Sequence, residues 1–446
     1  MNEARIGIVG AGWAGLAAAV TLVDAGQPVT LYEAAPRPGG RARDLPWQDL
    51  VLDNGQHLFI GAYRQTLTLL RTLGLDPEQA FLRLPLDLTL LGTPRQADLA
   101  LRAPALPAPL HLLAALLRAR GLGLGNRLRA LRFGAGWKAA RWPADDDISV
   151  SQWLREQGQS SRLCKTLWEP LCLAVMNTPP DTASARVFAR VLCDAFLHRR
   201  NDSDLLVPRR SLGALLPEPA VAWLRARGAE VVRGRIDAIA VEADGGFRLQ
   251  GRGLGIRRHT RLVLAPGHHA LASLLPDHPS LKGIADMARR FDSEPITTVY
   301  LRYPPQVRLA QPMLGLLSAP GQWLFDRRVA GEPGMMAVVI SAGGSHMTLS
   351  KEALIQAVSA QLANHFPLWP APRAGFVVRE KRATFRCEVG IDARRPGNAT
   401  PLPGLWLAGD FTDTSYPATL EGAVRSGVQC ALSVLNCGSE FQDISC

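Results

Sequence analysis

The apolar positions near the N-terminus change their period twice within a short stretch. The run "IGIV" (Ile6 to Val9) has no polar side chain and is typical of a buried strand. It is followed by "AGLAAAVTLVDAG", an apolar run of helical length that Gly26 closes, and then by "PVTLYE", a second strand that ends at Glu33. The order strand, helix, strand predicts a βαβ unit at the start of the chain.

Similar patterns return at wide intervals along the chain. The stretch "GAEVVRGRIDAIAVEADGGFRL" alternates like paired strands, and "TRLVLAPG" after it predicts another buried strand. Near the C-terminus, "LWLAGD" predicts a short buried strand and "LEGAVRSGVQCALSVL" an amphipathic helix. Between these regions, "ITTVYLRY" and "MMAVVISAG" predict further strands, and residues 148–200 predict helices.

The turn between the first strand and the first helix carries three glycines, Gly10, Gly12 and Gly15. The first permits a tight turn, the second lets a pyrophosphate approach the backbone, and the third lets the helix pack closely on the strand. The helix N-terminus adds unpaired N–H groups and a positive dipole end. Glu33 can accept hydrogen bonds from a ribose diol, which argues against NADP. The predicted dinucleotide contacts here are Gly10, Gly12, Trp13, Ala14, Gly15 and Glu33.

Two further motifs resemble the flavoprotein superfamily of amine oxidases and carotenoid desaturases. In "APRPGGRAR", the glycines can fold a loop back over the cofactor, and Arg41 can face its phosphates. In "GLWLAGDFTDTSYPATLEGAVRSG", the resemblance places the Gly-Asp pair at the ribityl-pyrophosphate part of FAD and directs the next helix N-terminus at the flavin ring. FAD is therefore the implied cofactor. The contacts that the resemblance adds are Gly40, Arg41, Gly55, Gln56, His57, Ile236 (through its backbone, at the adenine), Gly409, Asp410, Thr419 and Leu420.

The cofactor motifs lie far apart in the sequence, so the cofactor domain has to be assembled from separate segments. The expected fold is α/β, with a Rossmann-like FAD-binding domain of the glutathione-reductase and amine-oxidase type and an inserted α+β substrate domain. The expected FAD-binding domain comprises residues 1–83, 205–285 and 395–437. The expected substrate domain comprises residues 84–204 and 286–394, and residues 438–446 form a tail.

Composition restricts the class of protein and the cellular compartment that we expect. Hydrophobic residues make up 47% of the 446 residues and charged residues 20%, which is typical of a globular protein. The seven cysteines include no CxxC pair, which favours reduced thiols in a cytoplasmic compartment over a disulfide framework. The chain runs almost directly into "RIGIVGAG" without a secretory signal. His268 and His269 have no carboxylate or cysteine close in sequence, so no metal site is expected.

The formal net charge of +11 is unevenly distributed, because the segment from Leu99 to Ala144 contains no Asp or Glu. Its basic residues alternate with leucines and aromatic residues. Two interpretations remain open: helices within residues 103–142 that lie on an anionic membrane surface, such as the inner face of the cell membrane, or a solvated basic face above a leucine core. No nucleic-acid motif accompanies the charge, which argues against nucleic acid as a partner.

The segment "DNGQHLFIGAY" (Asp53 to Tyr63) mixes four polar residues with a bulky apolar group. Together with "LWEPLCLAVMNTPPDTASARVFARVL" (Leu167 to Leu192), it resembles the squalene-associated FAD-dependent desaturases of hopanoid-producing bacteria, the group that includes hydroxysqualene dehydroxylase. The resemblance covers nearly the whole chain. It implies that the polar residues of the first segment face the flavin, while Leu58, Phe59 and Ile60 line an isoprenoid tunnel.

The reaction implied by this resemblance is the reductive dehydroxylation of hydroxysqualene to squalene in hopanoid biosynthesis, with hydride passing from reduced FAD to an allylic cation. Such chemistry needs a dry apolar site and an acid that protonates the leaving hydroxyl. His57 is the first candidate for that acid, Asp53 could orient it or cap the loop, and Glu169 is the second candidate. For each, an ordinary structural role is the alternative. Beside the isoprenoid, the expected partners are a membrane surface and a hydroxysqualene-forming synthase.

Three rival functions share parts of this pattern. A phytoene-type desaturase or isomerase would use the same flavin and the same apolar site, and the fold does not fix the direction of electron flow. An amine oxidase is disfavoured because amine substrates favour an aromatic cage and aromatic residues make up only 6% of the chain. A non-catalytic isoprenoid carrier is disfavoured by the intact glycine turn with Glu33 and Asp410.

Overall fold

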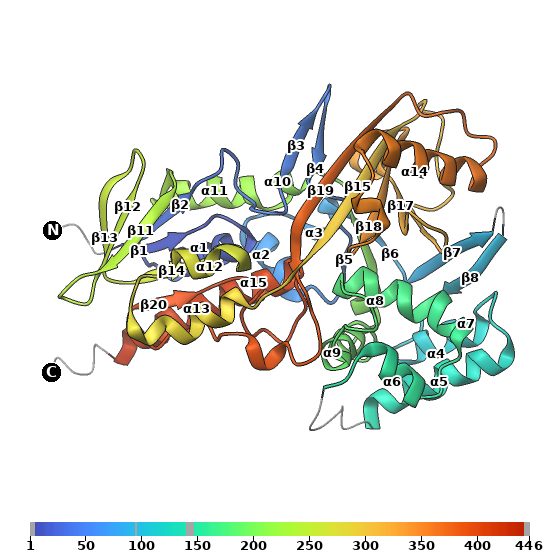
Figure 1. Ribbon diagram of the computed structural model, residues 1–446, viewed down its shortest axis with the longest axis horizontal. Helices are drawn as coiled ribbons and strands as arrows, with labels where there is room; N and C mark the ends of the chain where they lie inside the picture. Colours follow the sequence, from blue (N-terminus) through green and yellow to red (C-terminus); the bar gives the residue numbers. More distant parts are fainter. Residues whose placement is uncertain (1–4, 94–95, 140–146, 441–446) are drawn as a thin grey trace.

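The computed structural model describes residues 5–93, 96–139 and 147–440. Figure 1 shows two lobes that lie side by side along the long axis of the molecule. One lobe is built around a parallel sheet and contains both chain termini, and the other combines an antiparallel sheet with a group of helices. The chain passes between the lobes several times, so each lobe is made of segments that are distant in sequence.

The parallel sheet of the first lobe has five strands, and each neighbouring pair is parallel. Apolar runs without polar interruption form its centre because helices cover a parallel sheet on both faces, and all residues of β1, β14 and β20 are buried. The βαβ unit predicted at the start of the chain is confirmed. In sheet order the strands are β10 (Glu230–Arg233), β2 (Val29–Glu33), β1 (Ile6–Val9), β14 (Leu262–Leu264) and β20 (Leu405–Leu407).

The helices at the two ends of the sequence pack directly on one another in this lobe. A side chain at Gly427 of α15 (Leu420–Glu440) would clash with the Ala14 carbonyl oxygen of α1 (Trp13–Asp24), so the two backbones meet. This contact fixes the C-terminal segment against the glycine turn. The other helices of the lobe are α2 (Arg64–Thr72), α3 (Pro77–Ala80), α10 (Leu212–Leu215), α11 (Pro217–Ala226), α12 (His268–Leu274) and α13 (Lys282–Arg289).

Three small β-structures border the parallel sheet. The predicted pair of strands after Gly228 is only partly confirmed, because β10 joins the parallel sheet while the following strands form a separate antiparallel sheet. These strands are β11 (Ile236–Val241), β12 (Phe247–Gly251) and β13 (Gly255–His259). The others are the hairpin β3 (Asp44–Trp47) and β4 (Leu50–Asp53), and the sheet β5 (Phe59–Ile60), β9 (Leu205–Pro208) and β6 (Phe81–Leu84).

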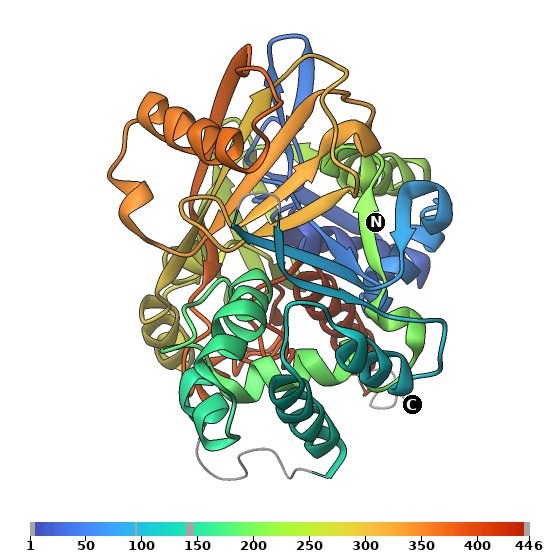
Figure 2. The same cartoon turned by 90° about the vertical axis from the view of Figure 1, so that its right-hand side faces the viewer.

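The second lobe contains a seven-stranded sheet whose two faces have different neighbours (Figure 2). Its outer face, with Val299, Leu301 and Val338, packs against α14 (Lys351–His365). Its other face, which we call the inner face, turns toward the first lobe and the helical group. The residues of the inner face are Ile296, Thr298, Tyr300, Trp323, Phe325, Met335, Ala337, Val339, Phe376 and Val378. The strands in sheet order are β19 (Ala374–Phe385), β15 (Ser293–Arg302), β18 (Met335–Ser341), β17 (Trp323–Asp326), β16 (Met313–Leu316), β7 (Asp87–Thr93) and β8 (Gln96–Arg102).

Helices complete the second lobe below the sheet. The helices predicted for residues 148–200 are confirmed. Within the described residues, no helix is both long enough and apolar enough to cross a membrane. The group comprises α4 (Leu110–Arg118), α5 (Leu124–Ala139), α6 (Val150–Glu156), α7 (Ser161–Leu163), a π-helical turn (Cys164–Trp168), α8 (Glu169–Met176) and α9 (Ala185–Phe196).

Candidate active site

The glycine turn forms a backbone cradle between two loops. The space beside Gly12 is open, since the nearest atom to a Cβ placed there would be the Gly40 Cα at 4.0 Å. Gly12 also pairs with Gly39 in an isolated bridge, so the loop "PGGRAR" lies opposite the start of α1 as the sequence predicts. Gly10 and Gly15 serve packing, because side chains there would clash with the Ala265 and Gly10 carbonyl oxygens.

The first residues of α1 are held from the other side of the turn. The Trp13 indole donates a hydrogen bond to the Ala42 carbonyl (3.2 Å), and its ring packs against Phe59. Ala14 is buried in the contact with α15. Both residues therefore offer a ligand only their backbone N–H groups at the helix N-terminus.

Glu33 lies at the end of β2 and borders a cavity of about 340 Å³. Its carboxylate accepts hydrogen bonds from the backbone N–H groups of Ala11 (2.8 Å) and Ala35 (2.7 Å), which fixes it at the mouth of the glycine turn. Val232 and Arg233 of β10, the strand that pairs with β2, also line this cavity. Ile236, expected to contact the adenine, begins β11 shortly after β10 and is buried. The volume is in the usual range of ligand sites.

Asp410 and Arg41, both expected to contact the cofactor, are joined to each other. Their ion pair is 2.6 Å long, and Arg41 also donates to the Ala383 carbonyl of β19 (2.7 Å). Burial alone would raise the pKa of Asp410, but the Arg41 guanidinium holds that pKa below its ordinary value. The carboxylate therefore stays charged, and the pair ties the strand end at Gly409 to the "PGGRAR" loop.

Arg395 is a residue of this site that the sequence patterns do not reveal. It is fully buried and holds the loop between β20 and α15. Its guanidinium donates to the carbonyl oxygens of Tyr416 (2.7 Å), Asp410 (3.0 Å) and Thr412, and to the Thr414 hydroxyl (2.9 Å). An arginine before a proline carries no local signal for this role, because these four partners lie 15 to 21 residues further along the chain.

The N-terminus of α15 is capped by Thr419, whose hydroxyl accepts a hydrogen bond from the Gly422 N–H (3.0 Å). Leu420 is the first helical residue. Glu421 beside it is fully buried and accepts hydrogen bonds from the N–H (3.0 Å) and hydroxyl (2.7 Å) of Thr66. One acid thus caps α2 and anchors α15, so the helix expected to face the flavin has a fixed direction.

The polar residues of "DNGQHLFIGAY" are held by the second lobe. Asp53 accepts a hydrogen bond from the Leu212 N–H (2.7 Å) and pairs with Arg327 (3.0 Å). Arg327, which is 3% exposed, also pairs with Glu332 (2.6 Å) and donates to the Gln56 side chain (2.7 Å). The structure therefore corrects the idea that Asp53 orients His57: its carboxylate bonds elsewhere and secures the loop.

His57 is half-buried, and its Nδ1 lies 2.7 Å from the Gly55 carbonyl oxygen. Because a carbonyl only accepts, Nδ1 carries the hydrogen. Burial lowers the pKa of His57, although the bond to Gly55 and the Asp53 carboxylate act in the opposite direction. The ring is therefore neutral near pH 7, with a lone pair on Nε2.

The apolar part of the same segment divides between the two lobes. Phe59 is fully buried in the first lobe, with Phe81 and Tyr63 around it. Leu58 and Ile60 pack instead against the cluster that includes the inner face. Successive residues of a strand point to opposite sides, so the expectation that all three line one tunnel is wrong for Phe59.

Glu169, the second candidate acid, begins α8 directly after the π-helical turn. Its carboxyl is half-buried, and this burial raises its pKa, while Lys165 acts in the opposite direction. Glu169 therefore retains a proton closer to neutral pH than an ordinary carboxyl does. Short π-helical turns are frequent at functional sites.

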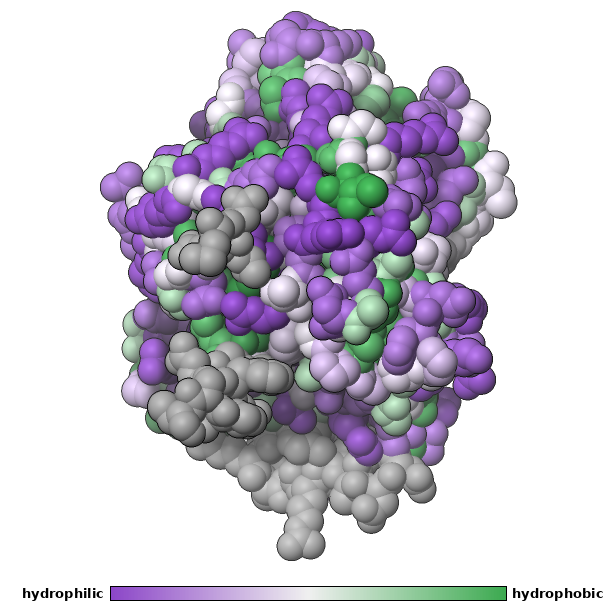
Figure 3. Space-filling model, turned by 90° about the vertical axis from the view of Figure 1, so that its left-hand side faces the viewer, coloured by the Kyte–Doolittle hydropathy of each residue, from purple (hydrophilic) through white to green (hydrophobic). Residues whose placement is uncertain are grey.

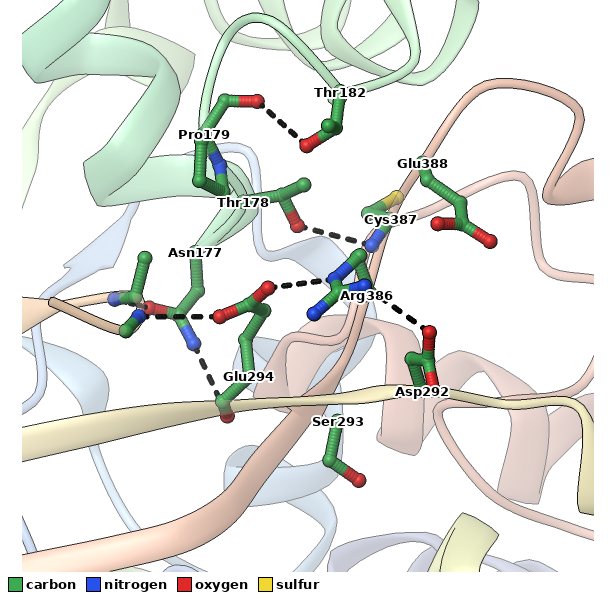
Figure 4. Close-up of polar contacts among 12 residues, drawn as sticks. Asn177, Thr178, Pro179, Thr182, Asp292, Ser293, Glu294, Arg386, Cys387 and Glu388 are labelled. Carbon is green, nitrogen blue, oxygen red and sulfur yellow. Dashed lines mark hydrogen bonds and ion pairs between the residues drawn. The ribbon is translucent and has the colours of Figure 1, made fainter.

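The "NTP" part of the motif after α8 joins the helices to the sheet (Figure 4). Asn177, with a φ of 47°, donates to the Pro295 carbonyl (3.2 Å) and the Thr384 hydroxyl (2.9 Å), and its side-chain oxygen accepts from the Ala342 N–H (2.7 Å). Glu294 pairs nearby with Arg386 (2.7 Å). One amide thus holds the ends of three strands of the sheet.

His268, next to His269 at the start of α12, is fully buried, and its Nε2 lies 2.7 Å from the Ser293 hydroxyl. Burial lowers the pKa of His268 to about 4. The rings of His269, Phe291 and Phe385 surround it edge-on.

Comparison with known proteins fits this geometry. A model of the flavin-containing amine oxidoreductases matches residues 13–435. The chain belongs to this family. Among solved structures, an oxidoreductase from Methanosarcina mazei has a TM-score of 0.73 at 16% identity, covering 97% of this chain and 100% of that one. A putative protoporphyrinogen oxidase from Exiguobacterium has a TM-score of 0.69 at 18% identity, covering 97% and 99%. These similarities confirm the expected α/β FAD-binding fold.

Curated relatives of this amine oxidoreductase indicate which members of the family it is similar to. The hydroxysqualene dehydroxylase of Rhodopseudomonas palustris is 30% identical over 97% of this chain and 98% of its own. That of Sinorhizobium fredii is 29% identical over 96% and 97%. The zeta-carotene desaturase of Zea mays is 25% identical over 98% of this chain and 84% of its own. The predicted resemblance is confirmed, and the protein is an FAD-dependent oxidoreductase.

The residues present fit FAD. The open space between Gly12 and Gly40 would take the pyrophosphate, and the cavity beside Glu33 would take the adenosine. Thr419 and Leu420 present the N-terminus of α15, whose N–H groups would stabilise negative charge on a reduced flavin.

Proposed function

We propose that this enzyme removes the hydroxyl of hydroxysqualene reductively and forms squalene. The observation that carries the proposal is its end-to-end similarity to three proteins of that activity. The inner face of the seven-stranded sheet supports it. There, Trp323, Phe325 and Val339 offer an apolar wall for a long isoprenoid, beside a loop that carries polar groups.

The reaction balances with two electrons from the cofactor. Reduced FAD supplies a hydride, so that hydroxysqualene and reduced FAD give squalene, water and oxidised FAD. The chain itself has to deliver a proton to the leaving oxygen as the carbon–oxygen bond breaks, and has to keep other water away from the allylic cation. The apolar inner face excludes water, and the 53–57 loop holds the reacting end of the substrate.

We propose Glu169 as the group that protonates the leaving oxygen and His57 as a group that holds it. The directions of the two pKa shifts support this division. Glu169, whose pKa is raised by burial, retains a proton closer to neutral pH. His57, whose pKa is lowered by burial, is neutral and offers a lone pair.

The test is single turnover without oxygen. Enzyme whose flavin has been reduced is mixed with hydroxysqualene, and flavin absorbance and squalene formation are followed together. We expect one equivalent of squalene to form as the flavin reoxidises. A flavin that stays reduced, with no squalene, would refute the proposed function.

A second candidate is oxidation of a carotenoid precursor. Several zeta-carotene and phytoene desaturases match the chain at 24–27% identity, which favours this function over the other rivals. Incubating oxidised enzyme with phytoene or zeta-carotene distinguishes the two. Flavin reduction with new conjugated double bonds would support the desaturase, and an unchanged flavin would support the dehydroxylase.

We also propose that the helix pair α4 and α5 lies on an anionic membrane surface. Of the exposed large hydrophobic side chains among the described residues, Leu110, Leu117, Leu124 and Leu128 lie on these helices, and Leu124 is 68% exposed. Arginines stand beside them in a segment without acidic residues. By contrast, the end of the first lobe that carries β12 and β13 is largely hydrophilic (Figure 3). Leucines and arginines together match lipid chains and anionic headgroups.

A further inference from the structure

Thr298 carries a buried hydroxyl that has no hydrogen-bond partner within the described part of the chain. The residue is 1% exposed and lies in the middle of β15. Leaving a buried hydroxyl unpaired costs folding free energy, whereas valine has the same shape and carries no such cost. An unpaired group of this kind requires an explanation, and a ligand that is bound during function is one.

The position of Thr298 on the sheet makes the hydroxyl more unusual. Its neighbours across the strands are Val339 of β18 and Val378 of β19, so the hydroxyl interrupts an apolar row of the inner face. Thr297, the preceding residue, points to the opposite side, where its hydroxyl lies 3.6 Å from the Met347 sulfur. The chain therefore offers two adjacent buried threonines on opposite faces of one strand.

The Thr298 hydroxyl faces the 53–57 loop at the point where that loop has no side chain. A Cβ placed on Gly55 would lie 3.6 Å from Thr298 Oγ1 and 3.8 Å from His57 Cε1. The ring of His57 donates through Nδ1 to Gly55 and leaves Nε2 as an acceptor. The Thr298 hydroxyl, a donor, and the His57 ring, which carries an acceptor, thus both lie close to the same point beside Gly55, next to the apolar inner face.

We propose that Thr298 and His57 together bind the hydroxyl of the isoprenoid alcohol above Gly55. Thr298 donates a hydrogen bond to the alcohol oxygen, and the alcohol O–H donates to His57 Nε2. An alcohol satisfies both groups at once, and a hydrocarbon satisfies neither. The pair would thus hold substrate more tightly than product. This inference rests on the proposed function, because it assigns the part of that site which recognises the substrate.

The experiment measures binding without turnover. Oxidised holoenzyme has no electrons to deliver, so hydroxysqualene and squalene in the same detergent can each be titrated against the flavin absorbance. For Thr298→Val we expect the affinity for hydroxysqualene to fall about three- to tenfold, with the affinity for squalene unchanged. Thr298→Ser should retain most of the preference. Thr297→Val is the matched control and should change neither affinity.

Thermal unfolding separates this role from a structural one. Thr298→Val should be as stable as the natural protein or more stable, since it removes an unpaired hydroxyl. A clear loss of stability would mean that the hydroxyl has a structural partner and would overturn the proposal.

Two binding results would also overturn it. One is an unchanged ratio of the two affinities in Thr298→Val, or no preference for the alcohol in the natural protein. The other is a shifted flavin reduction potential in Thr298→Val but not in Thr297→Val, with the ratio unchanged, because the hydroxyl would then contact the flavin. If titration shows the preference but single turnover gives no squalene, the proposed function fails while the alcohol site stands.

Discussion

The cofactor side and the substrate side of this site are built in opposite ways. On the cofactor side, charged side chains such as Glu33, Asp410 and Arg395 bond to backbone groups or to each other. On the substrate side, the inner face is apolar and contains the unpaired hydroxyl of Thr298. A cofactor that stays bound can be held by a rigid site whose side chains already have their hydrogen-bond and ion-pair partners. A substrate that must leave as a hydrocarbon suits an apolar wall with few polar contacts.

The most complete loss, that of the cofactor itself, is expected where the cofactor side has no side chain at all. Gly12→Val would fill the open space opposite Gly40, and we expect the purified protein to be colourless, with FAD affinity reduced by more than about a hundredfold, or roughly 3 kcal/mol. Gly123→Ala, which also adds atoms in open space but far from this turn, is the control and should stay yellow. A yellow Gly12→Val protein would contradict the pyrophosphate assignment.

The next effect concerns the proposed proton delivery by Glu169. Glu169→Gln should retain FAD and slow flavin reoxidation by hydroxysqualene roughly 10²- to 10⁴-fold, the usual contribution of a general acid. In the natural enzyme, the rate should fall as pH rises through the raised pKa of Glu169, because the protonated form is the active one. This pH dependence should disappear in the variant.

His57→Ala should also retain FAD and slow the same step, but with the pH dependence preserved. If His57 were the acid, the pH dependence would disappear in His57→Ala instead of in Glu169→Gln. An unchanged single-turnover rate in either variant would remove that residue from the reaction.

A fourth prediction compares a buried with an exposed ion pair between the lobes. Arg327→Met leaves Asp53 and Glu332 buried without their partner, which should destabilise the protein by about 3–5 kcal/mol. Arg302→Met breaks the solvent-exposed pair with Asp49 and should cost much less, because water and salt screen exposed charges. Denaturant unfolding measures both. Equal losses would mean that the Arg327 network does not hold the 53–57 loop.

The smallest effect is expected at the surface. Exposed arginines near a membrane contribute about 1 kcal/mol each, so changing four of them to glutamine should reduce flotation with anionic liposomes and leave neutral liposomes unaffected. The four are Arg118, Arg120, Arg129 and Arg132, and Arg127 is spared because it donates to the Leu117 and Leu122 carbonyls. The control changes four exposed arginines of the first lobe, Arg235, Arg252, Arg258 and Arg290. Equal flotation of both variants would contradict a basic membrane patch.

Local patterns predicted the cofactor side well because its features are local. A glycine turn between a strand and a helix, an acid at the end of the next strand and a Gly-Asp strand end before a C-terminal helix can each be read from a few consecutive residues. The substrate side could not be read in this way. Arg327 and Asp53 are 274 residues apart. The prediction that Phe59 lines the substrate tunnel is wrong because a two-residue strand is too short a pattern to fix the direction of its side chains.

The sequence by itself determined the βαβ unit, the glycine turn, the family and FAD, since these depend on spacing and on backbone geometry that neighbouring residues dictate. Tertiary structure alone decided that Asp53 secures a loop instead of orienting His57, that Arg395 holds the approach to α15, and that Thr298 faces Gly55. Hydrogen bonds and packing act over a few ångströms in space and are indifferent to distance along the chain. Only the folded chain brings such partners together.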